Sequence, residues 1–168
     1  MFREMRRSRQ QLSREAATEL LNRNTGGVLA VSGDDGYPYA VPMSYVYADG
    51  KIYFHSAKSG HKIDAIRRSE KASFCVIDQD RVVPEEYTTY FRSVIVFGRI
   101  HRVEEEAEKQ RVATMLAMKY ASDFKEGIPK EIRSSMGNME ILELTVEHMT
   151  AKEAIELVKQ RNAGSGIC

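Results

Sequence analysis

The sequence predicts a mainly β protein, an antiparallel barrel of about six strands with peripheral helices. Turn signals at residues 34–36 (Asp-Asp-Gly) and 49–50 (Asp-Gly) separate segments rich in aromatic and β-branched residues. Residues 139–147 alternate between apolar and acidic side chains, as a half-buried strand does. The antiparallel turn signals argue against a doubly wound sheet, and neither a GxGxxG nor a GxxxxGK[ST] motif occurs, so the common nucleotide-binding loops are absent.

Six segments have the composition of strands. The first three, separated by the two turn signals, are expected to form a β-meander. Pro38 and Pro42 interrupt the middle one, and proline cannot donate to a ladder, so this strand is expected to be irregular or to face a ligand. The long fifth strand is expected to kink at Gly98. The predicted strands are residues 28–32, 37–47, 51–55, 72–77, 90–103 and 139–147.

Four segments predict helices. Ser13 and Ser59 are suitable N-cap residues for the first two, and Gly26-Gly27 follows the first. In the third, Val112, Leu116 and Tyr120 recur at helical spacing behind an acidic first turn. The predicted helices are residues 13–22, 59–68, 104–120 and 152–160; residues 78–89 and 121–138 are expected to be loops, the second with at most one helical turn.

Length and composition indicate a single domain spanning residues 1–168, with its core at about residues 13–148 and the terminal helices peripheral. The net charge of +1 gives no reason to expect nucleic acid or an anionic membrane as a partner. No apolar run is long enough to span a bilayer, and the charged N-terminus does not resemble a signal peptide. Cys75, in a strand, and Cys168, in a tail expected to be mobile, offer no disulfide framework or CxxC metal site, so a cytoplasmic location is expected.

The most informative stretch for chemistry is residues 52–62, Ile-Tyr-Phe-His-Ser-Ala-Lys-Ser-Gly-His-Lys. A strand ends in polar residues, and a short loop then opens a helix. Helix N-termini carry unpaired N–H groups and bind anions, so Ser56, His61 and Lys62 suggest a phosphate site. The alternative is an ordinary capped surface helix whose lysine faces solvent.

His55 directly precedes this loop. Histidine titrates near neutral pH and is therefore a candidate proton donor, although a histidine at a strand end is more often a hydrogen-bonding residue without a catalytic role. Two other segments are weaker candidates for ligand contact: residues 41–45, as a wall for a planar ring, and Arg92 with Ser93, at a ligand edge. Each is equally explained as part of a core strand.

Metal binding and serine hydrolysis are poorly supported. The four histidines are dispersed, with no HxxxH or HExxH pattern, so no metal site is predicted. No GxSxG motif is present for a Ser-His-Asp hydrolase.

Four ordered motifs resemble the Nim-type (5-nitroimidazole reductase-like) branch of the pyridoxamine 5′-phosphate oxidase-like family. Residues 36–47 (GYPYAVPMSYVY) resemble the DGxPYxVPxxYxY stretch, and residues 53–63 resemble the YFHxAxxGxK segment. Residues 88–98 (TTYFRSVIVFG) resemble the YxSVxxxG strand. Residues 147–153 resemble a closing TGKE-like motif, with Ala151 where glycine is usual. The resemblance covers residues 5–155 and says more about the family than about the substrate.

The resemblance implies an FMN-binding split barrel that forms a homodimer, with each flavin site built from both subunits. His61 stands where pyridoxamine phosphate oxidases place arginine, so one bidentate charge is lost and phosphate affinity is expected to depend on pH. His55 matches a histidine near the flavin and is the expected catalytic residue. The cofactor-binding residues that the resemblance implies are Val41, Pro42, Met43, Ser44, His55, Ser56, Ala57, His61, Lys62, Arg92 and Ser93.

The implied activity is FMN-dependent transfer of electrons from NADH or NADPH to a small-molecule acceptor. A nitroimidazole reduced fully to its amine, as in 5-nitroimidazole resistance, is one such acceptor. The arginine-containing C-terminal signature of vitamin B6 oxidases is absent, which argues against that substrate. Two alternatives remain open at this stage: a non-catalytic flavin or small-molecule binding protein, and a split-barrel oxidoreductase that uses haem or a deazaflavin.

Overall fold

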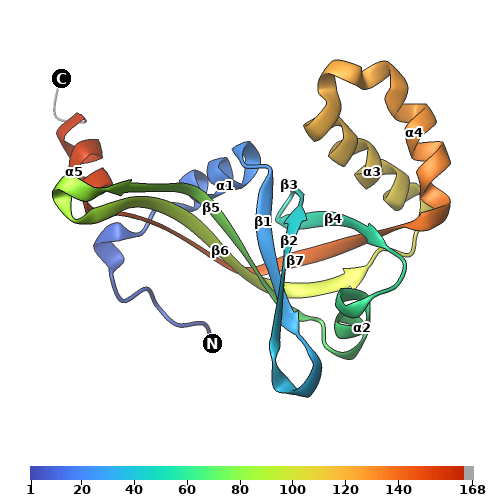
Figure 1. The fold of residues 1–168 in the computed structure, drawn as a ribbon, viewed down its shortest axis with the longest axis horizontal. Coiled ribbons are helices and arrows are strands. Elements are labelled where there is room, and N and C mark those ends of the chain that lie inside the picture. Colours follow the sequence, from blue (N-terminus) through green and yellow to red (C-terminus); the bar gives the residue numbers. More distant parts are fainter. Residues whose placement is uncertain (165–168) are drawn as a thin grey trace.

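The computed structural model describes residues 1–164, which form one antiparallel sheet of seven strands with helices around it (Figure 1). The strands are β1 (Gly26–Ser32), β2 (Pro38–Ser44), β3 (Val46–Ala48), β4 (Lys51–Ala57), β5 (Lys71–Val83), β6 (Thr88–Arg102) and β7 (Met139–Glu153). The helices are α1 (Arg14–Arg23), α2 (His61–Arg68), α3 (Glu106–Ala121), α4 (Ile128–Ser135) and α5 (Ile155–Gly164). The strand order is β2-β1-β5-β6-β7-β4-β3, with β2 and β3 as open edges, which confirms the predicted mainly β split barrel.

The segment predicted as one strand over residues 37–47 is broken at Tyr45. β2 pairs with β1, β3 pairs with β4, and the two lie at opposite edges of the sheet, so the predicted three-strand meander is wrong. The cause is the buried Tyr45 side chain. Its hydroxyl donates to the carbonyl oxygen of Leu21 (2.6 Å), and its ring packs edge-on against Phe74. Pro38 and Pro42 therefore lie in an edge strand, where proline is tolerated.

The loop predicted at residues 78–89 is wrong as well. β5 continues to Val83 and β6 begins at Thr88, so only a tight turn at residues 84–87 joins them. The resulting ribbon, residues 78–92, projects from the sheet beside α5 (Figure 1), and we call it the β5–β6 arm. Most of its side chains are exposed or half-buried, so its sequence lacks the apolar alternation by which a strand is recognised.

Gly98 marks the predicted kink in the long strand. The register between β6 and β7 shifts between Phe97 and Gly98, which confirms an irregularity there. A Cβ atom at Gly98 would overlap the carbonyl oxygen of Thr145, so the close approach of the two strands requires glycine.

The two N-terminal helices differ in how they begin. The Ser13 hydroxyl accepts a hydrogen bond from the Ala16 amide (3.2 Å), which confirms the predicted cap of α1. The predicted Ser59 cap of α2 is wrong, because Gly60 occupies the N-cap position with a φ of 121°. Only glycine adopts that backbone conformation readily, so the sharp entry into the helix is a property of Gly60.

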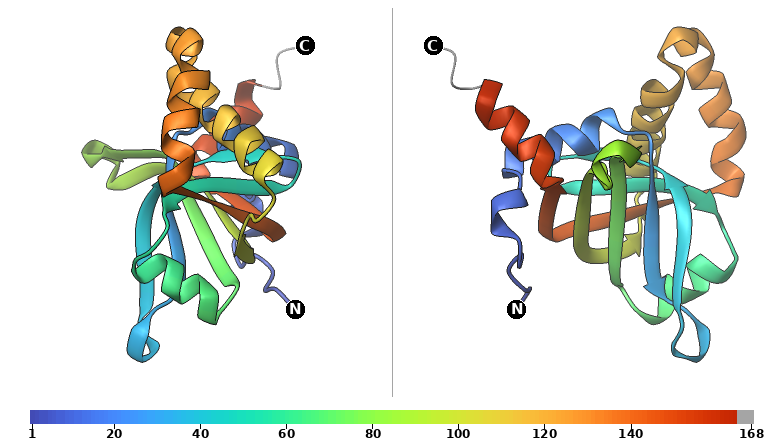
Figure 2. Two further views of the ribbon diagram at one scale, coloured as in Figure 1. Left: turned by 90° about the vertical axis from the view of Figure 1, so that its right-hand side faces the viewer. Right: turned by 60° about the vertical axis from the view of Figure 1, so that its left-hand side comes forward.

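The region after α3 is more helical than predicted. Residues 121–138 hold two 3₁₀ turns, Ser122–Gly127 and Met136–Asn138, on either side of α4. Ile128 and Ile132 are buried and lie four residues apart, a spacing too brief to stand out in the sequence. Figure 2 shows α3 and α4 as a helical pair at one end of the sheet.

The core divides between the two faces of β4. The larger cluster fills the barrel and includes Ile52, Phe54, Phe74, Val94 and Leu144. The smaller cluster lies under the α3–α4 pair and includes Tyr53, Val112, Leu116, Ile132 and Ile141. Because adjacent strand residues point to opposite faces, neighbouring residues of β4 serve different cores.

Two glutamates of β7 break the expected pattern of acidic side chains facing solvent. Glu140 and Glu143 are both buried. Arg102 donates two hydrogen bonds to Glu140, and the Lys51 ammonium lies 2.9 Å from Glu143. Arg102 belongs to β6 and Lys51 to β4, the two strands that pair with β7. The register of these strands places a cation beside each buried glutamate, which compensates the burial of its charge.

Cys75 is half-buried on β5, and burial raises the pKa of its thiol. Cys168 lies outside the described residues. Among residues 1–164, none of the helices is both long and apolar enough to cross a membrane.

Candidate functional site

The junction between β4 and α2 holds a buried hydroxyl without a partner. Ser56 is 6% exposed and, by strand alternation, shares the barrel-facing side of β4 with Phe54. Its Oγ atom is buried, and within residues 1–164 it has no hydrogen-bond partner. A buried hydroxyl without a partner is costly, so this atom is suited to meet a polar ligand.

The first turn of α2 adds donors at the same junction. The first intrahelical bond runs from the Asp64 amide to the Gly60 carbonyl oxygen (3.1 Å), so the preceding amides have no intrahelical partner. Lys62 is half-buried and forms no ion pair with any described residue. A helix N-terminus, an ammonium and an unpaired hydroxyl are the kinds of donor that an anion site uses.

His61 is differently engaged. Its imidazole stacks on the Tyr39 ring, with centroids 4.1 Å apart, and its Nε2 lies 3.4 Å from the Asp34 carboxylate. Asp34 also forms an ion pair with Arg68 (2.6 Å). In this arrangement His61 ties α2 to the turn between β1 and β2, whereas Ser56 and Lys62 are unengaged.

The predicted wall for the flavin ring is divided between the two faces of β2. Val41 and Met43 are half-buried and pack against the barrel core. Pro42 and Ser44 are exposed on the other face, and Ala57 is exposed at the end of β4. β2 is an edge strand, so its outward backbone groups have no strand partner and are available to a ligand.

His55 is exposed on the face of β4 opposite Ser56. It forms no side-chain hydrogen bond or ion pair with any described residue. Together with Ser44 it lines a cavity of about 340 Å³ between the barrel and the α3–α4 pair. The structure therefore brings Ser44 and His55 to one cavity, and His55 is next in the chain to the unpaired hydroxyl of Ser56.

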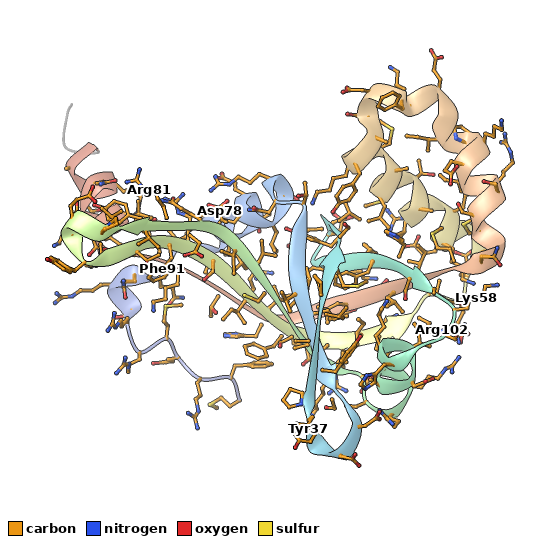
Figure 3. All side chains as sticks on the ribbon, in the orientation of Figure 1. Tyr37, Lys58, Asp78, Arg81, Phe91 and Arg102 are labelled. Atoms are coloured by element: carbon orange, nitrogen blue, oxygen red, sulfur yellow. The ribbon has the colours of Figure 1, made fainter. Side chains whose placement is uncertain are left out.

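Arg92 and Ser93 lie at the other end of the sheet. His55 pairs with Ile141, whose carbonyl oxygen accepts a hydrogen bond from Val103, eleven residues beyond Arg92 on the same chain segment. At about 3.3 Å per residue this corresponds to roughly 35 Å of strand. Figure 3 shows the same separation, with Phe91 far from Lys58 and Arg102. Within one protomer these two groups of predicted residues do not meet.

Arg92 is also surrounded by carboxylates. Its guanidinium donates to Glu153 (3.1 and 3.3 Å) and lies 3.6 Å from Asp78. Burial alone would raise the pKa of Asp78, but hydrogen bonds from Arg23 and Asn24 and the charge of Arg92 outweigh it and hold this pKa below its usual value. This end of the sheet is a paired charge network.

The sequence reasoning missed the helical wall of the cavity. Leu116 and Tyr120 of α3 and Ile132 and Ser135 of α4 all line it. Residues 121–138 were expected to form a loop, so α4 was not considered as part of a site. The burial of Ile128 and Ile132, one helical turn apart, is the signal that identifies α4.

A flavin mononucleotide fits the donor set at the α2 end of the sheet. Ser56, Lys62 and the first amides of α2 suit its phosphate, and the outer edge of β2 offers free backbone groups to a polar ring. No cluster of three or more His, Cys, Asp or Glu side chains within residues 1–164 is arranged to hold a metal ion.

Residues 13–153 match the family model of pyridoxamine 5′-phosphate oxidase. The chain belongs to this family. It is an oxidoreductase-type family, and the open seven-stranded sheet described above is consistent with its split-barrel fold. No curated protein matches the sequence.

Several solved structures share the fold of this family member. One is named as a 5-nitroimidazole antibiotic resistance protein from Bacteroides thetaiotaomicron (TM-score 0.71, 20% identity, covering 85% of this chain and 86% of that chain). Another is a conserved hypothetical protein from Mycobacterium tuberculosis (TM-score 0.78, 21% identity, covering 89% of this chain and 90% of that chain). A third is named as an FAD-binding protein from Mesorhizobium loti (TM-score 0.65, 23% identity, covering 86% of this chain and 97% of that chain). At these identities the likeness establishes the fold.

Proposed function

We propose that this protein is an FMN-dependent oxidoreductase that works as a homodimer and passes electrons from NADH or NADPH to a small-molecule acceptor, such as a nitroimidazole. The observation that carries the proposal is the unpaired, buried Ser56 hydroxyl beside the N-terminus of α2. Family membership and the flavin-binding names of several proteins with this fold support the choice of a flavin.

In this proposal Ser56, Lys62 and the amides of α2 hold the FMN phosphate, and His61 fixes the turn between β1 and β2 beside it. Pro42 and Ser44 supply the exposed face of β2 on which the ring lies, and Val41 and Met43, on the other face, fix this strand against the barrel core. FMN held by these residues would supply two-electron transfer between a nicotinamide donor and the acceptor. His55 supplies a proton to the acceptor from its Nδ1 or Nε2 atom.

The dimer resolves the separation of the predicted residues. Arg92 and Ser93 are too far from Ser56 within one protomer to touch the same mononucleotide. In a two-fold dimer the arm end of one protomer is free to lie beside the α2 end of its partner, and symmetry then creates two equal sites. Each flavin would bridge two subunits, as the family resemblance implies.

An exposed apolar surface is available for that contact. Val28, Ile77, Ile95 and Phe97 are between 38 and 60% exposed. The pairing of β1, β5 and β6 places all four on the same, outward side of the sheet. The Phe2 ring partly covers Phe97, with ring centroids 5.6 Å apart. Burying such a surface between two copies would stabilise an isologous interface.

Three measurements test the proposal. The protein is purified and its visible spectrum recorded, and flavin absorption bands are expected. NADH or NADPH oxidation is then followed with a nitroaromatic acceptor, and acceptor-dependent turnover is expected. Light scattering of the flavin-loaded protein should give the mass of a dimer. A Soret band without flavin would indicate haem, flavin without turnover would indicate a binding protein, and a monomer with bound flavin would refute the shared site.

A further inference from the structure

The cavity between β4 and the α3–α4 pair is separate from the anion site. It has a volume of about 340 Å³, within the range of small-ligand pockets. Its helical wall and floor are mainly apolar: Ala113, Leu116, Ala117, Ile132 and Met139. His55 and Ser44 enter from the barrel side. By strand alternation, His55 and Ser56 are on opposite sides of β4.

Most polar groups of the helical wall are already satisfied. The Tyr120 hydroxyl accepts from the Tyr45 amide (2.8 Å) and is within hydrogen-bonding distance of the Tyr45 carbonyl oxygen (2.9 Å). The Ser135 hydroxyl donates to the Glu131 carbonyl oxygen (2.7 Å). Backbone amides in the interior of α3 and α4 are used within the helices. The groups that remain for a ligand are His55, the Ser44 hydroxyl and the Glu131 carboxylate, none of which is paired with another described residue.

This wall does not suit the pyrimidine edge of a flavin, which needs several donors and acceptors, because groups left unpaired on burial cost free energy. It suits a small, largely apolar molecule with one polar group directed at His55. The Glu131 carboxylate, exposed on α4, disfavours an anion.

We propose that this cavity is the acceptor site: it binds small, largely apolar molecules that are neutral or cationic beside His55, nitroaromatic compounds among them, and Glu131 selects against anionic ones. The proposal rests on the proposed oxidoreductase function for the source of electrons. For a nitroaromatic acceptor, reduced flavin supplies two electrons, and two protons convert the nitro group to a nitroso group and water. The binding step itself does not require the flavin.

The test uses 4-nitrobenzyl alcohol, 4-nitrobenzylamine and 4-nitrobenzoate, which share one aromatic core and differ in charge. Ala117→Trp fills the cavity, and Met118→Trp adds the same side chain at an exposed position on the same helix. The chain has no native tryptophan, so the fluorescence of each variant reports whether it is folded. Equilibrium dialysis measures probe binding without any need for turnover, and FMN titration measures cofactor affinity.

We expect Ala117→Trp to weaken binding of the neutral alcohol at least tenfold while FMN affinity changes less than twofold, and Met118→Trp to change neither. Glu131→Gln should strengthen nitrobenzoate binding about two- to fivefold and leave the alcohol unchanged. Ala117→Leu is the milder filling variant if the tryptophan variant is unfolded. Unchanged probe binding in the filled variant would overturn the proposal, as would lost FMN affinity, which would place the flavin ring in the cavity. A protein that binds the probes but takes up no flavin would retain this site and refute the proposed function instead.

Discussion

The two ends of the sheet treat polar side chains in opposite ways. At the arm end, Glu153 is 1% exposed and receives hydrogen bonds from Arg92 and Arg161, and Asp78 receives them from Arg23 and Asn24. At the α2 end, the described structure provides no hydrogen-bond partner for the buried Ser56 hydroxyl. Both ends carry residues that sequence motifs single out, but within residues 1–164 the carboxylates Glu153 and Asp78 of the arm end are paired, whereas the Ser56 hydroxyl of the α2 end is not.

This difference separates groups that stabilise the protomer from groups that await a ligand. When one partner of a buried ion pair is removed, the other charge stays buried without compensation, which lowers the stability of the chain. A buried polar group without a partner costs free energy until something binds it. Substitutions of the paired carboxylates Glu153 and Asp78 at the arm end should therefore mainly change stability, and those of unpaired groups at the α2 end should mainly change cofactor binding or turnover.

The largest effect is expected for His55→Asn. Loss of a positioned proton donor should lower turnover per bound flavin by about 10²–10⁴, with flavin occupancy retained. Occupancy and acceptor reduction are measured in the same preparation between about pH 5.5 and 8.5, which brackets the usual imidazole pKa. His101→Asn, a change at an exposed histidine of β6, serves as the control. Lost occupancy with an unchanged rate per flavin would make His55 a cofactor ligand only.

Glu153→Ala tests the paired end. It leaves Arg92 without its closest carboxylate and should lower the free energy of unfolding by about 3 kcal/mol, measured by urea titration. The matched control is Glu147→Ala, because the ion pair of Glu147 with Arg99 is exposed and should contribute less than about 1 kcal/mol. Equal effects of the two substitutions would show that the network at the arm end adds nothing beyond a surface ion pair.

Lys62→Ala tests the unpaired end. Losing one charge-assisted contact should weaken FMN binding about ten- to hundredfold, or about 1.5–3 kcal/mol, with little change in the stability of the apoprotein. Lys130→Ala, on the exposed side of α4, is the control. Unchanged affinity in an FMN titration would remove Lys62 from the phosphate site.

The smallest effect concerns pH. The pKa of Asp78 is lower in the folded chain than in the unfolded chain, so its stabilisation is complete above the ordinary aspartate pKa and is lost as pH falls through the folded value. Asp78→Asn should cost about 1 kcal/mol at neutral pH, because its partner Arg23 is half exposed, and the difference from the parent should vanish in acid. Urea titrations between about pH 3 and 7 measure this. Asp80→Asn, at an exposed carboxylate of the same arm, should show no such trend.

The sequence predicted α1 and α3, which have one exposed and one buried face, because periodicity reports burial. It also predicted the first part of β7, although residues 140–144 are buried on both faces of that strand. The prediction from sequence failed for the β5–β6 arm, where most side chains are exposed or half-buried. It also failed for α4, whose buried face consists of only two residues, Ile128 and Ile132. For the candidate site too, the sequence predicted only what local patterns encode. Residues 52–62 are consecutive, so their proximity needed no tertiary information, whereas the α3–α4 wall of the cavity depends on packing that local motifs do not encode.

The position of β4 in the sheet sets the order in which the site is completed. β4 carries His55 and Ser56, and it joins the sheet through β7, since its other neighbour is the three-residue edge strand β3. β7 begins at Met139, 82 residues after β4 ends at Ala57. During synthesis, which proceeds from the N-terminus, β1, β2, β5 and β6 are able to pair while β4 still lacks its inner neighbour. Under the proposed function, capture of the cofactor would therefore be a late event during synthesis, because it would follow the pairing of β4 with β7.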